Sequence, residues 1–336
     1  MDRKAAARIF TAPARQALAA FPIDPDVLEL VSVGENATFR VTDRRDGGAY
    51  VLRLHRPWYH THDRLLAERV WVRALAEAGI AVPVAVPARD GAEYTTVTIP
   101  EIGEQRFAGL VRWTEGQLLS QVLARTTDPQ VVEGHFQQLG AVAAAIHNQS
   151  SAWRPPDGFS RHALDRDGLM GDAPFWGPFW EHATLSATER RLLLAARDRI
   201  RGVLDRLGHD PSTWGLIHAD MHPGNVLVAG GRLTVIDFDD AAFGWHHYEI
   251  AVALVHQQPA ANFIAIEDAF LAGYRALRPF SEAQRAWLPL FRLIRGMVQI
   301  GWYHQRPEHG VPDHFVPMKD HVCDQCTAFL RDGTVP

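Results

Sequence analysis

The residues whose types and spacing best suit chemistry lie between positions 216 and 241. A polar loop at 218–225, with the sequence HADMHPGN, follows a short apolar stretch, and an acidic run, IDFDD, occupies 236–240. The Gly230-Gly231 pair between them favours a turn that joins two short strands. We therefore expect a hairpin that brings the polar loop and the acidic strand end close together.

Phosphoryl transfer is the chemistry that this pattern would suit. Its transition state is stabilised mainly by electrostatics, so a protein must position the hydroxyl nucleophile and hold cations on the phosphates. Asp220 could accept or orient the proton of a hydroxyl group. The amide oxygen of Asn225 and the carboxylate of Asp237 could hold Mg²⁺, which prefers oxygen ligands. The simpler alternative is a hairpin whose polar residues only cap turns, but the length of the combined pattern favours phosphoryl transfer.

Short strands and one helix are predicted for the first third of the chain. Four stretches rich in β-branched and aromatic residues are separated by turn-forming residues, at 28–43, 47–57, 92–102 and 105–116. A helix is expected at 61–79, where Gly79 would end it. Its apolar stripe is predicted to consist of Leu66, Ala67, Val70, Trp71, Ala74, Leu75 and Ala78.

The rest of the chain is predicted to be mainly helical. At 131–150, helical spacing places five apolar residues on one face: Val132, Phe136, Leu139, Ala143 and Ile146. The stretch 153–180, rich in Pro, Gly and Trp, has the composition of a binding loop or lid. Its Trp153, Trp176 and Trp180 could form a wall of an acceptor pocket or, alternatively, a hydrophobic cluster.

These elements predict an α+β fold of two lobes, like that of protein kinases. The first lobe, 1–111, would contain an N-terminal helix, a small antiparallel sheet and one further helix. A hinge at 112–116 would lead to a larger, mainly helical lobe at 117–336. That second lobe is expected to carry both the catalytic loop, 218–225, and the metal-binding segment, 236–240.

The segment 216–241 resembles the catalytic centre of the aminoglycoside phosphotransferase and choline kinase superfamily. The resemblance implies that Asp220 is the catalytic base, that Asn225 and Asp237 bind Mg²⁺, and that ATP is the phosphoryl donor. The stretches 154–180 and 236–254 look most like the RdoA-like stress-response kinase branch. That branch implies a Ser/Thr side chain of a protein as acceptor. A small alcohol, similar to homoserine, choline or an aminoglycoside, is the alternative acceptor, and a nucleotide-binding pseudokinase is a further alternative.

The nucleotide side departs from this family's pattern at one position. Arg53 stands where the resemblance implies a lysine for the α- and β-phosphates, and arginine keeps the charge and can grip phosphate with its planar fork. Glu68 lies at the edge of the apolar stripe and is expected to pair with Arg53. The alternative is a local pair between Arg64 and Glu68, one helical turn apart.

Two further segments are expected to contact the nucleotide. The turn at 32–38 would cover the phosphates, with Gly34 and Asn36 as binding residues, although an ordinary hairpin turn is the alternative. The hinge would hold the adenine, with Trp113 and Glu115 lining its pocket.

Other polar residues are assigned structural roles. One of Asp239 and Asp240 would orient a metal ligand or the surrounding arginines; the alternative is that they cap the helix after Gly244. His218 and His222 are expected to brace backbone groups. Cys323 and Cys326 are expected to be buried thiols, because a zinc site needs about four ligands. His55, His60 and His62 are expected to be solvated.

Composition narrows the possible partners and compartment. The 336 residues carry a formal net charge of −5, which argues against non-specific nucleic-acid binding, since that requires clustered Lys and Arg. No apolar stretch approaches the roughly 20 residues of a membrane span. The N-terminal segment reads as an amphipathic helix and not as a signal peptide. We therefore expect a cytoplasmic protein that binds ATP and a hydroxyl-bearing substrate, with no membrane or nucleic-acid partner.

Overall fold

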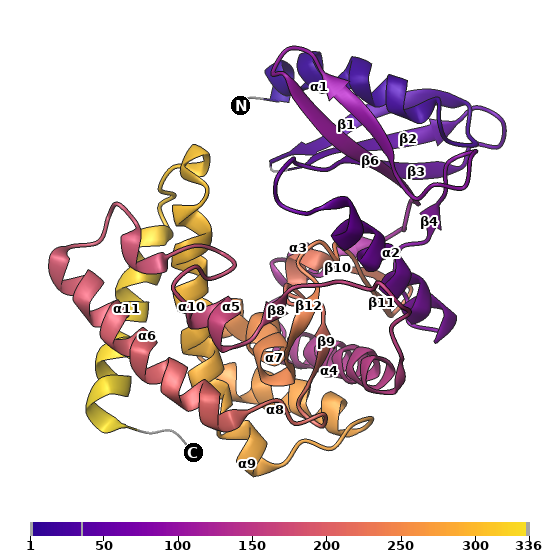
Figure 1. Ribbon diagram of the computed structural model, residues 1–336. Helices are drawn as coiled ribbons and strands as arrows, with labels where there is room; N and C mark the ends of the chain where they lie inside the picture. Colours follow the sequence, from indigo (N-terminus) through magenta and orange to yellow (C-terminus); the bar gives the residue numbers. More distant parts are fainter. Residues whose placement is uncertain (1–2, 35, 334–336) are drawn as a thin grey trace. The chain divides into compact units, whose positions relative to one another are not determined.

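The structure is a computed structural model that describes residues 3–34 and 36–333 (Figure 1). The chain divides into two compact units. The first comprises Met1–Gln117, Pro155–Ser160 and Leu227–Asp239, and the second comprises Leu118–Arg154, Arg161–Val226 and Asp240–Pro336. The acidic hairpin at 227–239, which we expected in the helical lobe, thus belongs to the first unit.

The first unit is built on an antiparallel sheet with strand order β1-β2-β3-β6-β4, in which β5 also pairs with β6. Its strands and helices are β1 (Pro25–Val33), β2 (Ala37–Asp43), β3 (Ala49–Leu54), β4 (Ala85–Val86), β5 (Thr95–Ile99), β6 (Glu104–Arg112), α1 (Arg3–Leu18) and α2 (His62–Glu77). Successive strand residues face opposite sides of a sheet. In β3 the buried Tyr50, Leu52 and Leu54 join the core that α1 also enters with Phe10, so Arg53 faces the other side.

Helix α2 confirms the predicted helix and its end, but its buried face differs from the predicted stripe. Leu66 and Val70 are half-buried and Ala78 is exposed. The buried residues are Leu65, Ala67, Glu68, Arg69, Trp71, Val72 and Leu75. The face is rotated because Glu68 and Arg69, which an apolar pattern leaves out, both point inward. Apolar spacing alone therefore misplaced this stripe.

The second unit is mainly helical. Its helices are α3 (Leu119–Leu123), α4 (Pro129–Ala152), α5 (Arg166–Met170), α6 (Ala187–Leu207), α7 (His246–Leu254), α8 (Phe263–Arg275), α9 (Glu282–Arg285), α10 (Leu288–His304) and α11 (Phe315–Asp332), with 3₁₀ turns η1 (Phe179–Glu181), η2 (Pro223–Asn225), η3 (Val255–Gln257) and η4 (Pro307–His309). A small sheet has the order β8-β12-β9, from β8 (Ala163–Leu164), β12 (Ala242–Trp245) and β9 (Trp214–Ile217). The remaining sheet has the order β11-β10-β7, from β11 (Arg232–Val235), β10 (Val226–Ala229) and β7 (Gln117–Leu118), and its β10–β11 hairpin belongs to the first unit except for Val226.

Helices α4 and α8 approach each other closely through two glycines. A Cβ on Gly140 of α4 would lie 1.9 Å from the carbonyl oxygen of Phe270, and one on Gly273 of α8 would lie 1.8 Å from that of Gln137. Neither position therefore tolerates a side chain without moving a helix. The predicted apolar face of α4 is buried as expected at four of its five positions, Val132 being half-buried.

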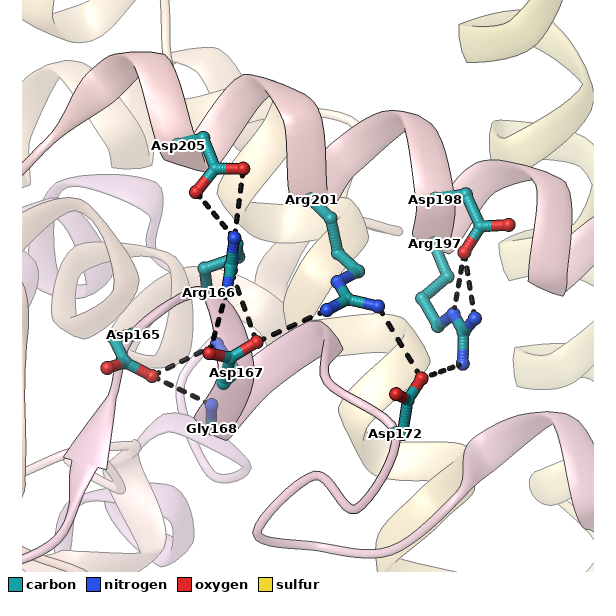
Figure 2. Close-up of polar contacts among 9 residues, drawn as sticks. All are labelled: Asp165, Arg166, Asp167, Gly168, Asp172, Arg197, Asp198, Arg201 and Asp205. Atoms are coloured by element: carbon teal, nitrogen blue, oxygen red, sulfur yellow. Dashed lines mark hydrogen bonds and ion pairs between the residues drawn. The ribbon is translucent and has the colours of Figure 1, made fainter.

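Two tryptophans of the aromatic stretch after α4 pack into the core of the second unit. Trp176 and Trp180 are buried in its main hydrophobic cluster, so for these two the cluster interpretation is correct and the pocket wall is not. Trp153 is half-buried. Nearby, an exposed network of ion pairs joins α5 to α6, as Figure 2 shows: Arg166 bridges Asp167 and Asp205, and Arg201 bridges Asp167 and Asp172. Exposed pairs of this kind contribute little stability each.

Within the part of the chain that the structure describes, no helix is long and apolar enough to cross a membrane.

Candidate active site

The predicted catalytic loop begins directly after β9 and ends in η2. The side-chain amide of Asn225 donates two hydrogen bonds to Asp220, one to its backbone carbonyl and one to Oδ2, both at 2.9 Å. His222 Nδ1 accepts a hydrogen bond from the backbone N–H of Gly224 at 3.0 Å. His218 Nδ1 accepts one from the backbone of Asp220 at 3.2 Å. The loop is thus held by its own polar side chains, and the bracing role predicted for both histidines is confirmed.

The carboxylate of Asp220 is held ionised by a residue that sequence reasoning missed. Arg295, on α10, donates from Nη2 to Asp220 Oδ1 at 2.7 Å. Burial acts to raise the pKa of Asp220, but the charge of Arg295 and the hydrogen bond from His222 outweigh it and hold the pKa below its usual range. Asp220 is therefore a carboxylate at any physiological pH.

The backbone before Asp220 is held by a second missed residue, Glu249 of α7. Its Oε1 accepts from the backbone N–H of His218 and its Oε2 from that of Ala219, both at 2.8 Å. Ala219 has a φ of +67°, a left-handed conformation that costs a non-glycine residue free energy. Burial raises the pKa of Glu249 to about 7, although these two hydrogen bonds act in the opposite direction. Glu249 therefore holds the loop in a strained conformation.

One sequence signal could have found both residues. Each is a buried charged side chain in a mainly apolar helix: Glu249 in α7, where every residue is buried, and Arg295 in α10. A buried charge must be paired to be tolerated, so such a residue indicates a polar partner elsewhere in the fold. The sequence does not say which partner.

In the first unit, Arg53 reaches the acidic segment. Its Nη1 lies 2.6 Å from Oδ1 of Asp237, and both side chains are partly exposed. Asp237, like Ala219, has a left-handed backbone, with φ of +65°. Such strain in a non-glycine residue is common at functional sites. The two residues predicted to serve the phosphates and the metal are thus brought together within one unit.

Arg53 and Glu68 line the same cavity of the first unit but do not form the predicted ion pair. The cavity is lined by Val51, Arg53, His55, Glu68, Arg69, Val72, Pro83, Gly109, Val111, Asp237 and Phe238. Arg53 bonds to Asp237 instead, because that carboxylate approaches from the neighbouring hairpin. Glu68 Oε2 is buried with no hydrogen-bond partner among the described residues. A polar atom left in this state points to a missing cationic or hydrogen-bonding partner.

Asp239 has a structural role that neither of our alternatives described. His55 Nδ1 and His60 Nε2 lie 3.7 Å and 3.8 Å from its Oδ1, and His60 also bonds to its carbonyl oxygen. His55 and His60 are buried, so the prediction that they are solvated is wrong for these two, whereas His62 is exposed. Helix α7 begins after Trp245 without a side-chain cap, so neither aspartate caps it.

The phosphate turn is tied to this acidic segment. Asn36 donates from Nδ2 to Asp239 Oδ2 at 3.4 Å, and its Oδ1 accepts from the backbone of Arg56 at 2.9 Å. Gly34 has open space where a side chain would begin. Glu35, between them, lies outside the described residues.

Trp113 and Glu115, which are predicted to line an adenine pocket at the hinge, are not among the residues that line the cavity of Arg53 and Glu68. Trp113 stacks against Arg40, whose guanidinium lies 4.7 Å from the ring centroid, and Glu115 is exposed. Val111, two positions before Trp113, lines the cavity instead. Strand β6 ends at Arg112, so the regular alternation that brings Val111 to the cavity does not continue to Trp113.

The donor atoms suit a hard divalent cation. In the second unit, Asn225 donates both its bonds to Asp220 through Nδ2, so its Oδ1 is the atom able to bind a hard cation. In the first unit, Asp237 offers carboxylate oxygens. The described residues contain no group of three or more His, Cys, Asp or Glu suited to a metal. Cys323 and Cys326 are buried free thiols, as expected.

A comparison with known proteins decides the family. The profile of the phosphotransferase enzyme family matches residues 26–280. The chain belongs to this family. Its predicted membership of the aminoglycoside phosphotransferase and choline kinase superfamily, its kinase-like α+β fold and its class of enzyme are thereby confirmed.

Relatives of this phosphotransferase act on small molecules. A homoserine kinase of Rhizobium rhizogenes is 31% identical over 222 residues, which are 64% of this chain and 61% of that protein. A microcompartment-associated aminopropanol kinase is 29% identical, has a TM-score of 0.80, and is matched over 96% of this chain and 98% of its own. An amicoumacin kinase solved with AMP-PNP, Ca²⁺ and Ami has a TM-score of 0.78 at 21% identity, over 97% of this chain and 96% of its own.

These relatives favour the alternative acceptor over the main one predicted. The names of all three denote kinases of small molecules, whereas the RdoA-like interpretation implied a protein Ser/Thr side chain. The protein acceptor of this phosphotransferase stays a prediction without support from them. The likeness to the amicoumacin kinase, at 21% identity, shows the fold of this chain.

Proposed function

We propose that this phosphotransferase moves the γ-phosphate of ATP to a hydroxyl group of a small molecule, with Mg²⁺ bound to the nucleotide. The observation that carries the proposal is the state of Asp220: an ionised carboxylate between Arg295 and Asn225, on a loop that Glu249 holds in a strained conformation. A fixed anion of this kind is what an attacking hydroxyl requires.

Each named side chain has a chemical role in the proposal. Asp220 orients the acceptor hydroxyl and accepts its proton as the new P–O bond forms. Asn225, through Oδ1, and Asp237 are the proposed protein ligands of Mg²⁺, which neutralises charge on the phosphates when bound. Arg53 takes the place of the usual lysine and contacts the α- and β-phosphates.

Glu68 is the proposed partner of Arg53 in the nucleotide-bound state. With Mg²⁺ bound, Asp237 would direct its oxygens to the metal and release Arg53. Arg53 would then donate a hydrogen bond to the buried Oε2 of Glu68, which lines the same cavity. Asn36 and Gly34 are proposed to shape the turn over the phosphates. In this proposal, Trp113 and Glu115 contribute only their backbone groups, at the hinge.

ADP release tests the function directly. Purified protein would be supplied with ATP, Mg²⁺ and a panel of amino alcohols, hydroxy acids, sugars and a generic protein substrate. We expect ADP release that depends on one class of small alcohol and that EDTA abolishes. Phosphate found on the protein substrate instead would favour the RdoA-like interpretation, and ATP binding without any ADP release would favour a pseudokinase.

Replacing Arg53 by methionine should lower kcat/KM for ATP by about 100-fold, the effect typical of one lost charged contact to the transition state. Replacing it by lysine should retain most activity, because lysine carries its positive charge at a similar distance from the backbone. Arg40→Met is the matched control, since Arg40 lies on the adjacent strand and is exposed. Equal activity of Arg53→Met and Arg40→Met would remove Arg53 from the nucleotide site.

Replacing Asp237 by asparagine should raise the Mg²⁺ concentration needed for half-maximal activity by about 10-fold or more, because a neutral ligand holds a hard cation less well. A titration of initial rate against Mg²⁺ at saturating ATP measures this. Asp26→Asn is a suitable control, because Asp26 forms an exposed ion pair with Arg44 in the same unit. An unchanged Mg²⁺ dependence in the Asp237 variant would contradict its role as a metal ligand.

A further inference from the structure

A cavity of about 570 Å³ lies in the second unit, bounded by η3, α10 and α11. Helices α10 and α11 lie side by side there (Figure 1). Along α10, Arg292, Gly296, Gln299 and Tyr303 recur at helical spacing and line one wall. The volume lies within the range of about 300 to 1,000 Å³ typical of small-molecule sites.

Two sets of contacts connect the lining of the cavity with Asp220. On one side, His222 Nε2 lies 3.4 Å from Asp220 Oδ2, and the ring of His256, which lines the cavity, lies 5.5 Å from that of His222. On the other side, Arg295 bonds to Asp220, and the next residue along α10, Gly296, lines the cavity. A molecule in the cavity would therefore border the groups that surround Asp220.

The lining of this cavity, in the part of the chain that the structure describes, has a positively charged arginine and no acidic residue. Among the described residues that line the cavity there is no aspartate or glutamate, whereas Arg292 carries a permanent positive charge. Arg292 also pairs with Glu267 of α8, but Glu267 does not line the cavity. Gln258, Gln299 and Gln325 add neutral donors and acceptors. A cationic alcohol would find no carboxylate partner in this lining, whereas a carboxylate would find a guanidinium.

We propose that this cavity holds the phosphoryl acceptor and that the acceptor is a small alcohol bearing a carboxylate, which faces Arg292. The proposal rests on the proposed phosphoryl transfer to a small-molecule hydroxyl. In the reaction, the acceptor oxygen bonds to the γ-phosphorus while the bond from that phosphorus to the β–γ bridging oxygen breaks. The hydroxyl proton passes to Asp220, and ADP leaves with the electron pair.

Three probes of nearly the same size separate the effect of the carboxylate from that of the amine. They are 4-hydroxybutyrate, which has only the carboxylate, L-homoserine, which has both groups, and 3-aminopropan-1-ol, which is L-homoserine without its carboxylate. We expect kcat/KM for L-homoserine to exceed that for 3-aminopropan-1-ol by about 10-fold or more, the contribution of one charge-assisted hydrogen bond. 4-Hydroxybutyrate should also be phosphorylated.

The Arg292→Gln variant tests whether the preference for a carboxylate arises in this cavity. It should raise KM for L-homoserine by about 10-fold with kcat nearly unchanged, because the lost contact holds substrate and transition state alike. KM for ATP and for 3-aminopropan-1-ol should not change. Arg285→Gln is the matched control: Arg285 bonds to the same Glu267 but does not line the cavity. If Arg285→Gln raised KM for L-homoserine equally, the effect would come from Glu267 and not from the cavity, and the proposal would fail.

Gln299→Glu provides the reciprocal test, since it adds a carboxylate to the lining. It should lower kcat/KM for L-homoserine and raise that for 3-aminopropan-1-ol, whereas Gln130→Glu, on the exposed start of α4, should change neither. A wild-type preference for the cationic probe, or ADP release with other alcohols but with neither carboxylate probe, would overturn this inference and leave the kinase function intact. Absence of ADP release with every alcohol would instead refute the proposed function, and this inference with it.

Discussion

Replacing Asp220 by asparagine is expected to lower kcat by about 10²- to 10⁴-fold, the usual contribution of a positioned acid–base group. The side chain would keep its size but lose the charge that Arg295 and Asn225 now hold in place. Affinity for ATP should stay near that of the wild type, because the proposed phosphate contacts come from other residues. Rapid-mixing measurement of ADP formation, together with nucleotide binding, separates the two quantities.

Asp324→Asn is the control for this experiment, since Asp324 is an exposed residue of α11 in the same unit. It should leave kcat unchanged. Because the pKa of Asp220 lies below its usual range, its ionisation should not limit the rate anywhere above pH 5. A wild-type kcat in the Asp220→Asn variant would remove Asp220 from the mechanism and with it the basis of the proposed function.

Replacing Glu249 by glutamine is the second change for which we expect a large effect. Both carboxylate oxygens accept backbone hydrogen bonds at 2.8 Å, whereas an amide can turn only its oxygen to one of these donors. The other donor would be left buried and unsatisfied, at a cost of about 1–3 kcal/mol in the free energy of unfolding. Because the same bonds hold Ala219 in its strained conformation, kcat should fall as well. Urea denaturation and steady-state kinetics measure the two effects.

The stability difference between wild type and Glu249→Gln should depend on pH. The pKa of Glu249 is raised from 4.5 to about 7 in the folded protein, so its contribution to stability is fully present below pH 4.5 and is lost as the pH rises through 7. Glutamine does not titrate. The wild type should therefore lose about 3 kcal/mol of stability relative to Glu249→Gln over this interval, which offsets the destabilisation of about 1–3 kcal/mol expected from the lost hydrogen bond.

Glu181→Gln, an exposed change in the same unit, should show no such dependence, and the contributions of all other groups cancel in the comparison. A destabilisation by Glu249→Gln that is constant between pH 4.5 and 8 would show that the carboxyl group is not buried in the way described.

Local parts of the site could be predicted from sequence because their contacts lie close along the chain. Asn225 bonds to Asp220 five positions earlier, and His222 caps the turn that contains Gly224, so the pattern of residue types in one loop determines the geometry. Strand β3 was also predictable, since period-two alternation alone turns Arg53 away from the α1 core.

The partners of these residues could not be predicted in the same way. Arg53 and Asp237 are 184 positions apart in the sequence, and Arg295 and Asp220 are 75 positions apart. Local periodicity carries no information about pairs so widely separated in sequence. Helix α2 shows the same limit, because an apolar pattern cannot anticipate that Glu68 and Arg69 line a cavity.

The sequence by itself thus determined the family, the kinase-like α+β fold and the identity of the loop carboxylate, since these depend on residue types at short spacing. Only the tertiary structure decided which charges accompany that carboxylate, which unit carries the acidic hairpin, and which residues line a cavity in each unit. The physical reason is that a buried charge is stable only beside its partner, and packing of distant helices and strands is what brings the two together.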